Sequence, residues 1–326
     1  MTSKRYLVTG GSGFIGATLV RRLLERGDTV RILDNHSRGA MRRIADVLDD
    51  VEAVECDIRD ASKVTAAGKG IDAIVHLAYV NGTEFFYKHP ELVLDVAVRG
   101  MINVLDACRA NEIGELVLAS SSEVYQMPPQ VPTPEAAPLI VPDVMNPRYS
   151  YGGGKIVCEL MAMNYGQKGF QRVMVFRPHN VYGPDMGWEH VVPQFIVRAA
   201  DAVKAHPQGP VPFPIQGDGS HRRAFVHIDD FTDGLLCVLD DGKHLNVYHI
   251  GNPEEVTIRE LAVRVLACFG REVAIIPGEA PAGTPERRVP DIGKLRKLGY
   301  EPRIPLSAGL PPVVDWYISH AHLRPH

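Results

Sequence analysis

The sequence predicts an α/β protein: a doubly wound parallel sheet with a smaller C-terminal lobe that interleaves with it. Short apolar runs alternate with longer segments of helical periodicity, and prolines become frequent after Tyr182. The chain has 326 residues, of which 45% are hydrophobic and 23% charged. This composition suffices for a sizeable core and excludes a disordered chain. A net charge of −4 and a pI near 6.4 argue against a broad surface for nucleic acids or membranes.

Six apolar runs are expected to form the strands of the sheet. They are rich in Val, Ile and Leu with little polar alternation, which is typical of parallel strands buried on both faces. In chain order they cover residues 6–9, 29–33, 51–54, 73–77, 115–119 and 173–176. The segments 14–26, 90–111 and 149–168 predict helices between them. Strand–helix–strand alternation implies right-handed crossovers.

The second half of the chain predicts a lobe of shorter elements. Helices are expected over residues 191–203, 228–239, 258–269 and 312–319, with a strand at 247–250. We therefore divide the chain into a sheet domain, residues 1–182, to which part of 223–250 returns, and a smaller lobe that is mainly residues 183–326. The loop 126–147 carries seven prolines and is expected on the surface near the carboxyl edge of the sheet.

Five scattered cysteines predict buried thiols in a reducing compartment. No two of them lie within thirty residues of each other, so there is neither a CxxC motif nor a cysteine-based zinc knuckle. The first predicted strand begins almost at Met1, which leaves no room for a signal peptide. No apolar run approaches the roughly 18 residues of a membrane span. We expect a cytoplasmic protein without a metal site.

A glycine-rich turn joins the first predicted strand to the first helix. Gly10, Gly13 and Gly16 allow the backbone to approach a pyrophosphate, which the N–H groups at the helix N-terminus then bind. Asp34 ends the next strand eighteen residues beyond Gly16, where a carboxylate accepts ribose hydroxyls and repels a 2′-phosphate. The sheet is therefore predicted to be of the Rossmann type and to bind NAD rather than NADP.

Asp57 and Ile58 follow the third strand at the same edge of the sheet. They are suited to meet the adenine of the dinucleotide, although a solvent-facing loop acid is an almost equal alternative for Asp57.

Tyr151 and Lys155 are candidates for proton transfer. They lie four residues apart on a predicted helix and so share one face. An ammonium beside the phenol, together with a positive nicotinamide, favours phenolate, which is a base near neutral pH. The serines 120–122 follow the fifth strand, where a hydroxyl can share the proton of a substrate with the tyrosine. The glycines 152–154 cost about 1 kcal/mol each within a helix, which suggests close approach by a ligand or a neighbouring backbone.

These motifs together resemble the extended short-chain dehydrogenase/reductase family, in its nucleotide-sugar epimerase/dehydratase branch. The resemblance covers nearly the whole chain, and the order and spacing of the motifs make it specific. It rests on the segments 10–16, 76–78, 120–125, 177–184, 217–219, 225–230 and 290–292, and on Asp34, Tyr151, Lys155, Arg223 and Lys294. Members of this branch bind NAD tightly and oxidise the sugar, usually at C4, to a ketone. They then epimerise, dehydrate or decarboxylate it, and often return the hydride.

The resemblance implies a role for each matched residue. Tyr151 would be the base, Lys155 would hold the ribose and tune the tyrosine, and Ser121 would bind the reacting hydroxyl. The diphosphate would be held by Arg223, Arg288 and Asn180. Further positions implied at the cofactor are Phe14, Ile15, Leu77 and Ala78, and at the nucleotide-diphosphate sugar Ser122, Tyr79 and Arg148. The family also implies a homodimer formed through the helices 90–111 and 149–168.

Glu123, two residues after Ser121, bears on the reaction that follows oxidation. In relatives acting at C5 or C6, a carboxylate here abstracts the C5 proton that the 4-ketone has acidified. A dehydratase or decarboxylase is thereby implied, and Arg148 fits the decarboxylase pattern. Simple 4-epimerases need only Tyr, Lys and Ser, so epimerisation stays open, with Glu123 facing solvent. Tyr79 and Gln126 replace the usual Ala and Gly, which suggests a less common sugar. An NAD(P)H-dependent ketone reductase and a non-catalytic dinucleotide sensor remain alternatives of other classes.

Overall fold

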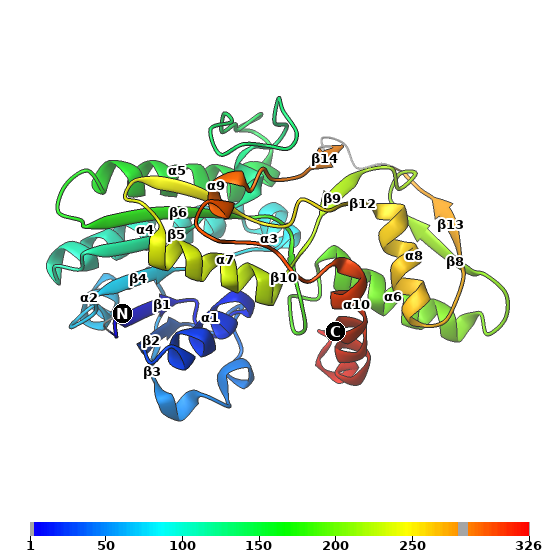
Figure 1. Cartoon of the computed structure of the whole chain (residues 1–326), viewed down its shortest axis with the longest axis horizontal. Helices are drawn as coiled ribbons and strands as arrows, with labels where there is room; N and C mark the ends of the chain where they lie inside the picture. Colours follow the sequence, from blue (N-terminus) through cyan, green and yellow to red (C-terminus); the bar gives the residue numbers. More distant parts are fainter. Residues whose placement is uncertain (1–2, 280–285, 326) are drawn as a thin grey trace.

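A seven-stranded parallel sheet forms the centre of the molecule (Figure 1). The structure is a computed structural model that describes residues 3–279 and 286–325. The strand order of the sheet is β3-β2-β1-β4-β5-β6-β11. In chain order the strands are β1 (Arg5–Thr9), β2 (Thr29–Asp34), β3 (Val51–Glu55), β4 (Ala73–His76), β5 (Glu115–Ala119), β6 (Arg172–Pro178) and β11 (Asn246–Ile250). The direction of strand addition reverses between β1 and β4, which makes the sheet doubly wound and places a ligand crevice there.

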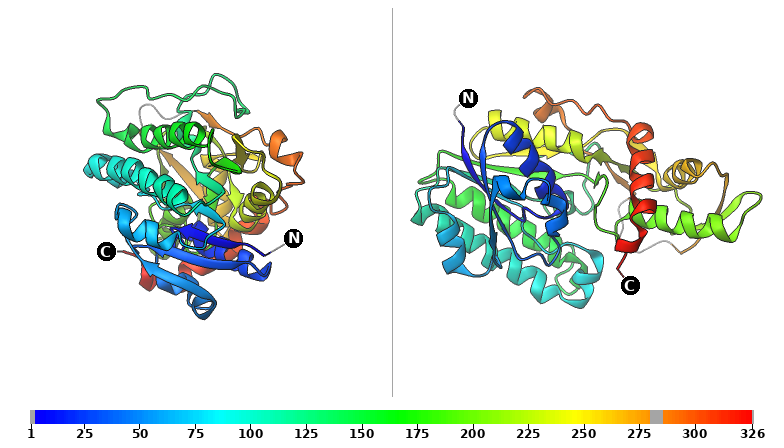
Figure 2. Two further views of the ribbon diagram at one scale, coloured as in Figure 1. Left: turned by 90° about the vertical axis from the view of Figure 1, so that its left-hand side faces the viewer. Right: turned by 90° about the horizontal axis from the view of Figure 1, so that it is seen from below.

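Helices cover both faces of this sheet (Figure 2). One face carries α1 (Phe14–Glu25) and α7 (Ile228–Asp241). The other face carries α2 (Ala61–Ala67), α4 (Pro90–Ala110) and α5 (Ser150–Tyr165), and α3 (Thr83–Lys88) leads into α4. Within β1, Tyr6 and Val8 pack with the first group of helices and Leu7 packs with the second, because alternate residues of a strand point to opposite faces. Burial on both faces explains the apolar strands.

The smaller lobe surrounds an apolar core of its own. It contains α6 (Val191–Ala205), α8 (Ile258–Cys268) and α10 (Leu306–Ser319), with β8 (Val211–Ile215) parallel to β13 (Val273–Pro277) (Figure 1). Two further sheets pair β10 (Val226–His227) with β7 (Val181–Tyr182), and β9 (Arg222–Ala224) with both β12 (Glu255–Thr257) and β14 (Arg287–Arg288). The remaining short helices are η1 (Met41–Ile44), η2 (Leu48–Asp50), η3 (Ser122–Val124), η4 (Pro147–Tyr149), α9 (Gly293–Arg296) and η5 (Ala321–Leu323). After β10 the chain packs against the large sheet as α7 and adds to it as β11.

The expected strands and helices are confirmed, and the main differences concern prolines. The helix expected at 312–319 begins at Leu306 and contains Pro311 and Pro312. Its buried side chains recur at helical spacing, so packing overrides the low helix propensity of proline: Leu306, Leu310, Val313 and Tyr317. The prolines at 212 and 214 lie in β8, one strand of a two-stranded sheet, where a missing N–H is tolerated.

The loop 126–147 projects beyond α5 (Figure 1), and its Val144 and Met145 are each 86% exposed. Thr133 within it forms a bridge to Pro290. Across residues 3–279 and 286–325, no helix is both long and apolar enough to span a bilayer. The division of the chain at residues 182 and 183 stays a prediction.

Candidate active site

The glycine-rich turn has the geometry of a dinucleotide-binding loop. Gly10 has a φ of +74°, and a Cβ there would lie 2.9 Å from the amide nitrogen of Ala78. A Cβ on Gly16 would lie 2.1 Å from the carbonyl oxygen of Gly10, so glycine is needed for α1 to pack on the turn. Gly13 precedes the helix, and no side chain of the described residues caps it there. The first N–H groups of α1 are therefore available to phosphate oxygens.

Asp34 stands at the carboxyl end of β2 with a fixed carboxylate. Its two oxygens accept hydrogen bonds from the backbone amides of Ser12, at 3.0 Å, and His36, at 2.8 Å. Each oxygen keeps acceptor capacity for a ribose hydroxyl. Gly39 lies directly against the Asp34 carboxylate. Glycine is needed there because a Cβ would lie 2.9 Å from both carboxylate oxygens. The residues of this crevice therefore fit the adenosine half of NAD.

Phe14 and Ile15 begin α1 directly after the glycine-rich turn, but they are not among the residues that line the crevice. The ring of Phe14 packs between two apolar cores, and Ile15 packs in one of them. Leu77 and Ala78 form the opposite wall of the crevice. Their amides donate to the hydroxyl of Thr9, each at 3.2 Å, and this fully buried threonine was not singled out from the sequence.

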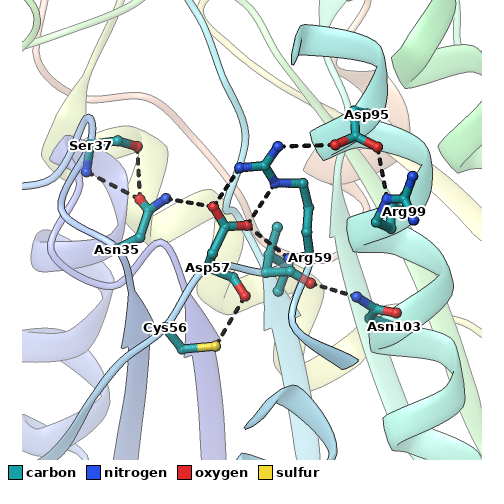
Figure 3. A network of polar contacts seen from close by, with 9 residues as sticks. Asn35, Ser37, Cys56, Asp57, Arg59, Asp95, Arg99 and Asn103 are labelled. Carbon is teal, nitrogen blue, oxygen red and sulfur yellow. Dashed lines mark hydrogen bonds and ion pairs between the residues drawn. The ribbon is translucent and has the colours of Figure 1, made fainter. Parts of the chain in front are cut away.

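Asp57 belongs to a surface network at the rim of the crevice (Figure 3). It accepts hydrogen bonds from Arg59, whose other side pairs with Asp95, and from Asn35 at 3.3 Å. The bond from Arg59 lowers the pKa of Asp57 to about 2. Asp57 and Ile58 both line the crevice, as expected of residues near an adenine. The arginine partner was not foreseen.

Ser121, Tyr151 and Lys155 come together at the carboxyl edge of the sheet. Ser121 follows β5, and the other two lie one turn apart in α5 with 8% and 4% exposure. Burial raises the pKa of Tyr151 to about 12, although a hydrogen bond with Ser121 acts in the opposite direction. Burial lowers the pKa of Lys155 to about 8. The Lys155 ammonium donates to the carbonyl of Ala119 at 2.7 Å and lies 5.9 Å from the Tyr151 ring centroid. These pKa shifts contain no contribution from the positive nicotinamide of NAD, on which the expectation also depends, so the role of Tyr151 as a base near neutral pH stays a prediction.

Two of the three glycines in α5 have close neighbours. A Cβ on Gly152 would lie 3.0 Å from the carbonyl oxygen of Glu123, and one on Gly154 would lie 2.3 Å from the hydroxyl of Tyr79. A Cβ on Gly153 would meet only Val141, at an ordinary 3.5 Å, among the described atoms. A neighbouring backbone, as expected, approaches Gly152, whereas the close neighbours of Gly154 are side chains and no described protein atom crowds Gly153.

Glu123 lies among three arginines. It forms an ion pair with Arg288, which stands opposite Arg223 in the pairing of β14 with β9. Burial alone raises the pKa of Glu123, but the charges of Arg288, Arg148 and Arg223 lower it overall. Burial, together with the neighbouring Arg288, lowers the pKa of Arg223 to about 10. Glu123 is thus held among arginines while 29% of its side chain stays exposed to solvent.

Ser122 and Asn180 are less directly available. Ser122 is buried in η3, where its carbonyl accepts from the amide of Tyr125. Asn180 has a φ of +43° and uses one amide hydrogen to bind the carbonyl of Ala224 at 2.8 Å. Asn180 therefore anchors β9, the strand that carries Arg223. Its other side-chain polar atoms remain for a ligand.

A buried ion pair beneath the site was missed at the sequence level. Glu159, one turn after Lys155, accepts two hydrogen bonds from Arg177, at 2.8 and 2.6 Å, and a third from Ser120. Arg177 also donates to the hydroxyl of Tyr125. The spacing in the sequence could have indicated it, because Glu159 lies four residues after Lys155 and so shares the helix face of Tyr151 and Lys155.

Among the buried polar atoms that lack a hydrogen-bond partner within the described part of the chain, five belong to the loop 126–147, the start of α5 and the end of β6 or residues next to them. They are Oε1 of Gln126, Oγ of Ser150, Nε of Arg148 and both ring nitrogens of His179. Native proteins pair nearly all such atoms, so a polar ligand is their natural complement. Over the described ranges, no group of three or more His, Cys, Asp or Glu side chains could hold a metal ion.

A phosphate-binding turn at the switch point of a doubly wound sheet, with serine, tyrosine and lysine beside it, defines a dinucleotide-dependent enzyme of the short-chain dehydrogenase/reductase type. More narrowly, the chain belongs to the NAD dependent epimerase/dehydratase family, whose profile matches residues 6–251. It is an enzyme of the nucleotide-sugar branch, with NAD as its cofactor.

Named relatives span the nucleotide-sugar reactions. A dTDP-4-dehydro-6-deoxy-D-allose reductase from a Streptomyces species is 33% identical over 339 residues, covering 98% of this chain and 99% of that protein. UDP-glucuronic acid decarboxylase 1 of Arabidopsis thaliana is 31% identical, covering 95% and 69% respectively. The crystal structure of a dTDP-glucose 4,6-dehydratase from Streptomyces venezuelae, solved with NAD and a second ligand, superposes with a TM-score of 0.86 at 31% identity, covering 98% of each chain. The predicted family, fold class and cofactor are confirmed.

Proposed function

We propose that this enzyme converts a nucleotide-diphosphate sugar through a transient 4-keto sugar, with Tyr151 as the base and NAD regenerated in each cycle. The observation that carries the proposal is the convergence of Ser121, Tyr151 and Glu123, with the Tyr151 ring against Tyr79 of the crevice wall. Two arginines on paired strands, Arg223 and Arg288, lie beside them and suit a diphosphate.

The residues divide the first step between them. Tyr151 takes the proton of the C4 hydroxyl, and Ser121 hydrogen-bonds both that oxygen and the phenol. Lys155 directs an ammonium hydrogen to the ribose. When bound, NAD⁺ supplies the hydride acceptor and a positive charge that favours the phenolate of Tyr151.

Glu123 supports a second step at C5. Its arginine neighbours keep it ionised, and a carboxylate can take the C5 proton that the 4-ketone has made acidic. Loss of the C6 hydroxyl as water then gives a dehydratase. Decarboxylation remains the variant in which Arg148 binds a sugar carboxylate, and an epimerase would return the hydrogen to the opposite face of C4.

A second candidate function is reduction of a 4-keto sugar. It is favoured by the Streptomyces reductase described above, which matches along 98% of this chain. A reductase consumes reduced cofactor with every turnover. Asp34 favours NAD over the phosphorylated cofactor.

We also propose a homodimer formed through α4 and α5, which lie side by side on one face of the sheet (Figure 2). Leu94 and Ile102 of α4 and Val157 and Leu160 of α5 are exposed apolar side chains, from 38% to 59% accessible. We place the enzyme in the cytoplasm, because its five cysteines are free. Its net charge of −4 favours neither nucleic acid nor membrane as a partner.

The test is incubation of the purified protein with UDP-, GDP-, dTDP- and CDP-sugars, followed by mass spectrometry of the products. Loss of water or carbon dioxide, or an isomer of unchanged mass, identifies the reaction. Tyr151→Phe should lower turnover about 100-fold or more, whereas the matched control Tyr149→Phe should not. Equal activity of both variants would refute the assignment of the base.

A further inference from the structure

The side chain of Tyr79, which the steps above do not use, lies against the Lys155 ammonium. It follows β4 at the wall of the NAD crevice. The ammonium of Lys155 lies 3.8 Å from the centroid of its ring, over the aromatic face. The Tyr79 ring also meets the Tyr151 ring edge-on, with centroids 5.2 Å apart and an interplanar angle of 83°. One aromatic side chain thus contacts both members of the proton-transfer pair.

Phe86 completes the enclosure of Tyr151 from the other side. Its ring, in α3, stacks on the Tyr151 ring with centroids 4.9 Å apart and an angle of 25°. The Tyr79 hydroxyl donates to the backbone carbonyl of Tyr151 at 3.3 Å. The Tyr151 ring is therefore held between the rings of Tyr79 and Phe86, which we call the aromatic clamp. The hydrogen bond from the Tyr79 hydroxyl also fixes the backbone of Tyr151.

Gly154 makes room for this clamp. A Cβ at that position would lie 2.3 Å from the Tyr79 hydroxyl oxygen but 3.6 Å from its Cζ, and 3.0 Å from the Cβ of Ala97. The hydroxyl of Tyr79 therefore occupies the space that a side chain on α5 would take. The phenolic oxygen of Tyr79, together with the closely packed Ala97, therefore explains why a glycine stands at this position of α5.

The contacts of Lys155 show what the ring contributes. An ammonium has three hydrogens. One points to the carbonyl of Ala119, the ring face of Tyr79 occupies a second direction, and a third is left for the cofactor ribose. Burial lowers the pKa of Lys155 to about 8, and a ring face favours its charged form. The other titratable groups near the ammonium are Tyr151, Cys158, Glu159 and His76.

We propose that Tyr79, accommodated by Gly154, is a positioning residue that holds the Lys155 ammonium and the Tyr151 ring in the geometry of proton transfer. This inference rests on the proposed roles of Tyr151 and Lys155. It gives a physical reason for an aromatic side chain at a position where the family commonly has Ala.

The first test compares Tyr79→Leu with Tyr79→Phe. Removing the ring should lower kcat about tenfold or more, leave the sugar KM within about twofold, and move the alkaline limb of the kcat profile to lower pH. Tyr79→Phe keeps the ring and should lose much less. Phe85→Leu is the matched control, because Phe85 lies against Arg38 and His89 instead. An unchanged pH profile in Tyr79→Leu would overturn the proposal.

The second test is the coupling between Tyr79 and Gly154. Gly154→Ala should lower kcat in the natural background and be partly rescued by Tyr79→Phe, which removes the clashing oxygen. Gly153→Ala is the control, since its Cβ would meet only Val141 among described atoms. Equal damage by Gly154→Ala in both backgrounds would contradict the inference.

A third measurement needs no substrate, so it separates this inference from the proposed function. Lysine labelled with ¹³C at Cε reports the titration of Lys155 by NMR, with the signal assigned through Lys155→Met. Tyr79→Leu should lower that pKa, whereas Phe85→Leu should not. If no sugar reacts but this shift occurs, the proposed function fails and the positioning role stands. If sugars react and the shift is absent, the positioning role fails.

Discussion

Replacing Glu159 by Gln is expected to destabilise the protein strongly, because it removes one charge of a buried ion pair. The side chains of Glu159 and Arg177 are only 6% and 4% exposed. Arg177 donates two bonds to the carboxylate, at 2.8 and 2.6 Å, and Ser120 donates a third. An amide keeps one acceptor oxygen but presents its NH₂ group to the arginine, so one charge-assisted bond is lost and the guanidinium is left without a counter-charge.

The magnitude follows from the buried charge. A charge-assisted hydrogen bond contributes about 1.5–3 kcal/mol, and removing one partner of a buried ion pair costs about 3–5 kcal/mol in all. We expect the free energy of unfolding to fall by about 3–5 kcal/mol. The double variant Glu159→Gln with Arg177→Met removes both charges and should recover part of this loss.

The assay is urea denaturation, with the midpoint and the m-value fitted separately. Glu84→Gln is the matched control, because it breaks an exposed ion pair with Lys88 and should leave the midpoint unchanged. A loss below about 1 kcal/mol for Glu159→Gln would refute the view that this pair is held dry beneath the active site.

Three further predictions concern the site and the proposed homodimer. Lys155→Met should abolish turnover yet raise the free energy of unfolding at pH 7 by about 1–3 kcal/mol, because a drop in the Lys155 pKa from 10.5 to about 8 penalises the folded state. The natural protein should gain stability from this group as pH rises from about 8 to 10.5, since the unfolded chain then binds more protons; urea titrations across that range check both. Asp34→Asn should weaken NAD binding and improve the relative affinity for NADP, measured by calorimetry. Leu160→Arg should convert a dimer to a monomer in light scattering.

The fold could be predicted from the sequence because its signals are local. Each strand of the large sheet is a short apolar run, and the glycine-rich turn lies between a strand and a helix in any doubly wound protein of this type. The α10 helix begins six residues before its predicted start, because core packing at Leu306 and Leu310 outweighs the low helix propensity of the prolines that follow. Propensity rules cannot register contacts made across the chain.

The site could be predicted only in its parts. The sequence indicated two arginines for a diphosphate, but their approach depends on the pairing of β14 with β9, which sets Arg288 opposite Arg223 across 65 positions. It also showed that Gly154 is costly in a helix, while the cause, the hydroxyl of Tyr79, lies 75 positions earlier. The raised pKa of Tyr151 likewise arises from burial, which spacing along a helix does not reveal.

The central claim is that the sugar is oxidised at C4 and that NAD is regenerated within the same turnover. The most direct measurement uses the reactive nucleotide sugar carrying deuterium at C4, with the purified protein and no added reduced cofactor. We expect multiple turnovers, with the deuterium retained in the product, at C6 after dehydration or at C4 after epimerisation or decarboxylation. If no C4-deuterated sugar reacts, and a 4-keto sugar is instead reduced with one equivalent of added reduced cofactor consumed per product, the proposed cycle is wrong and the enzyme is a reductase.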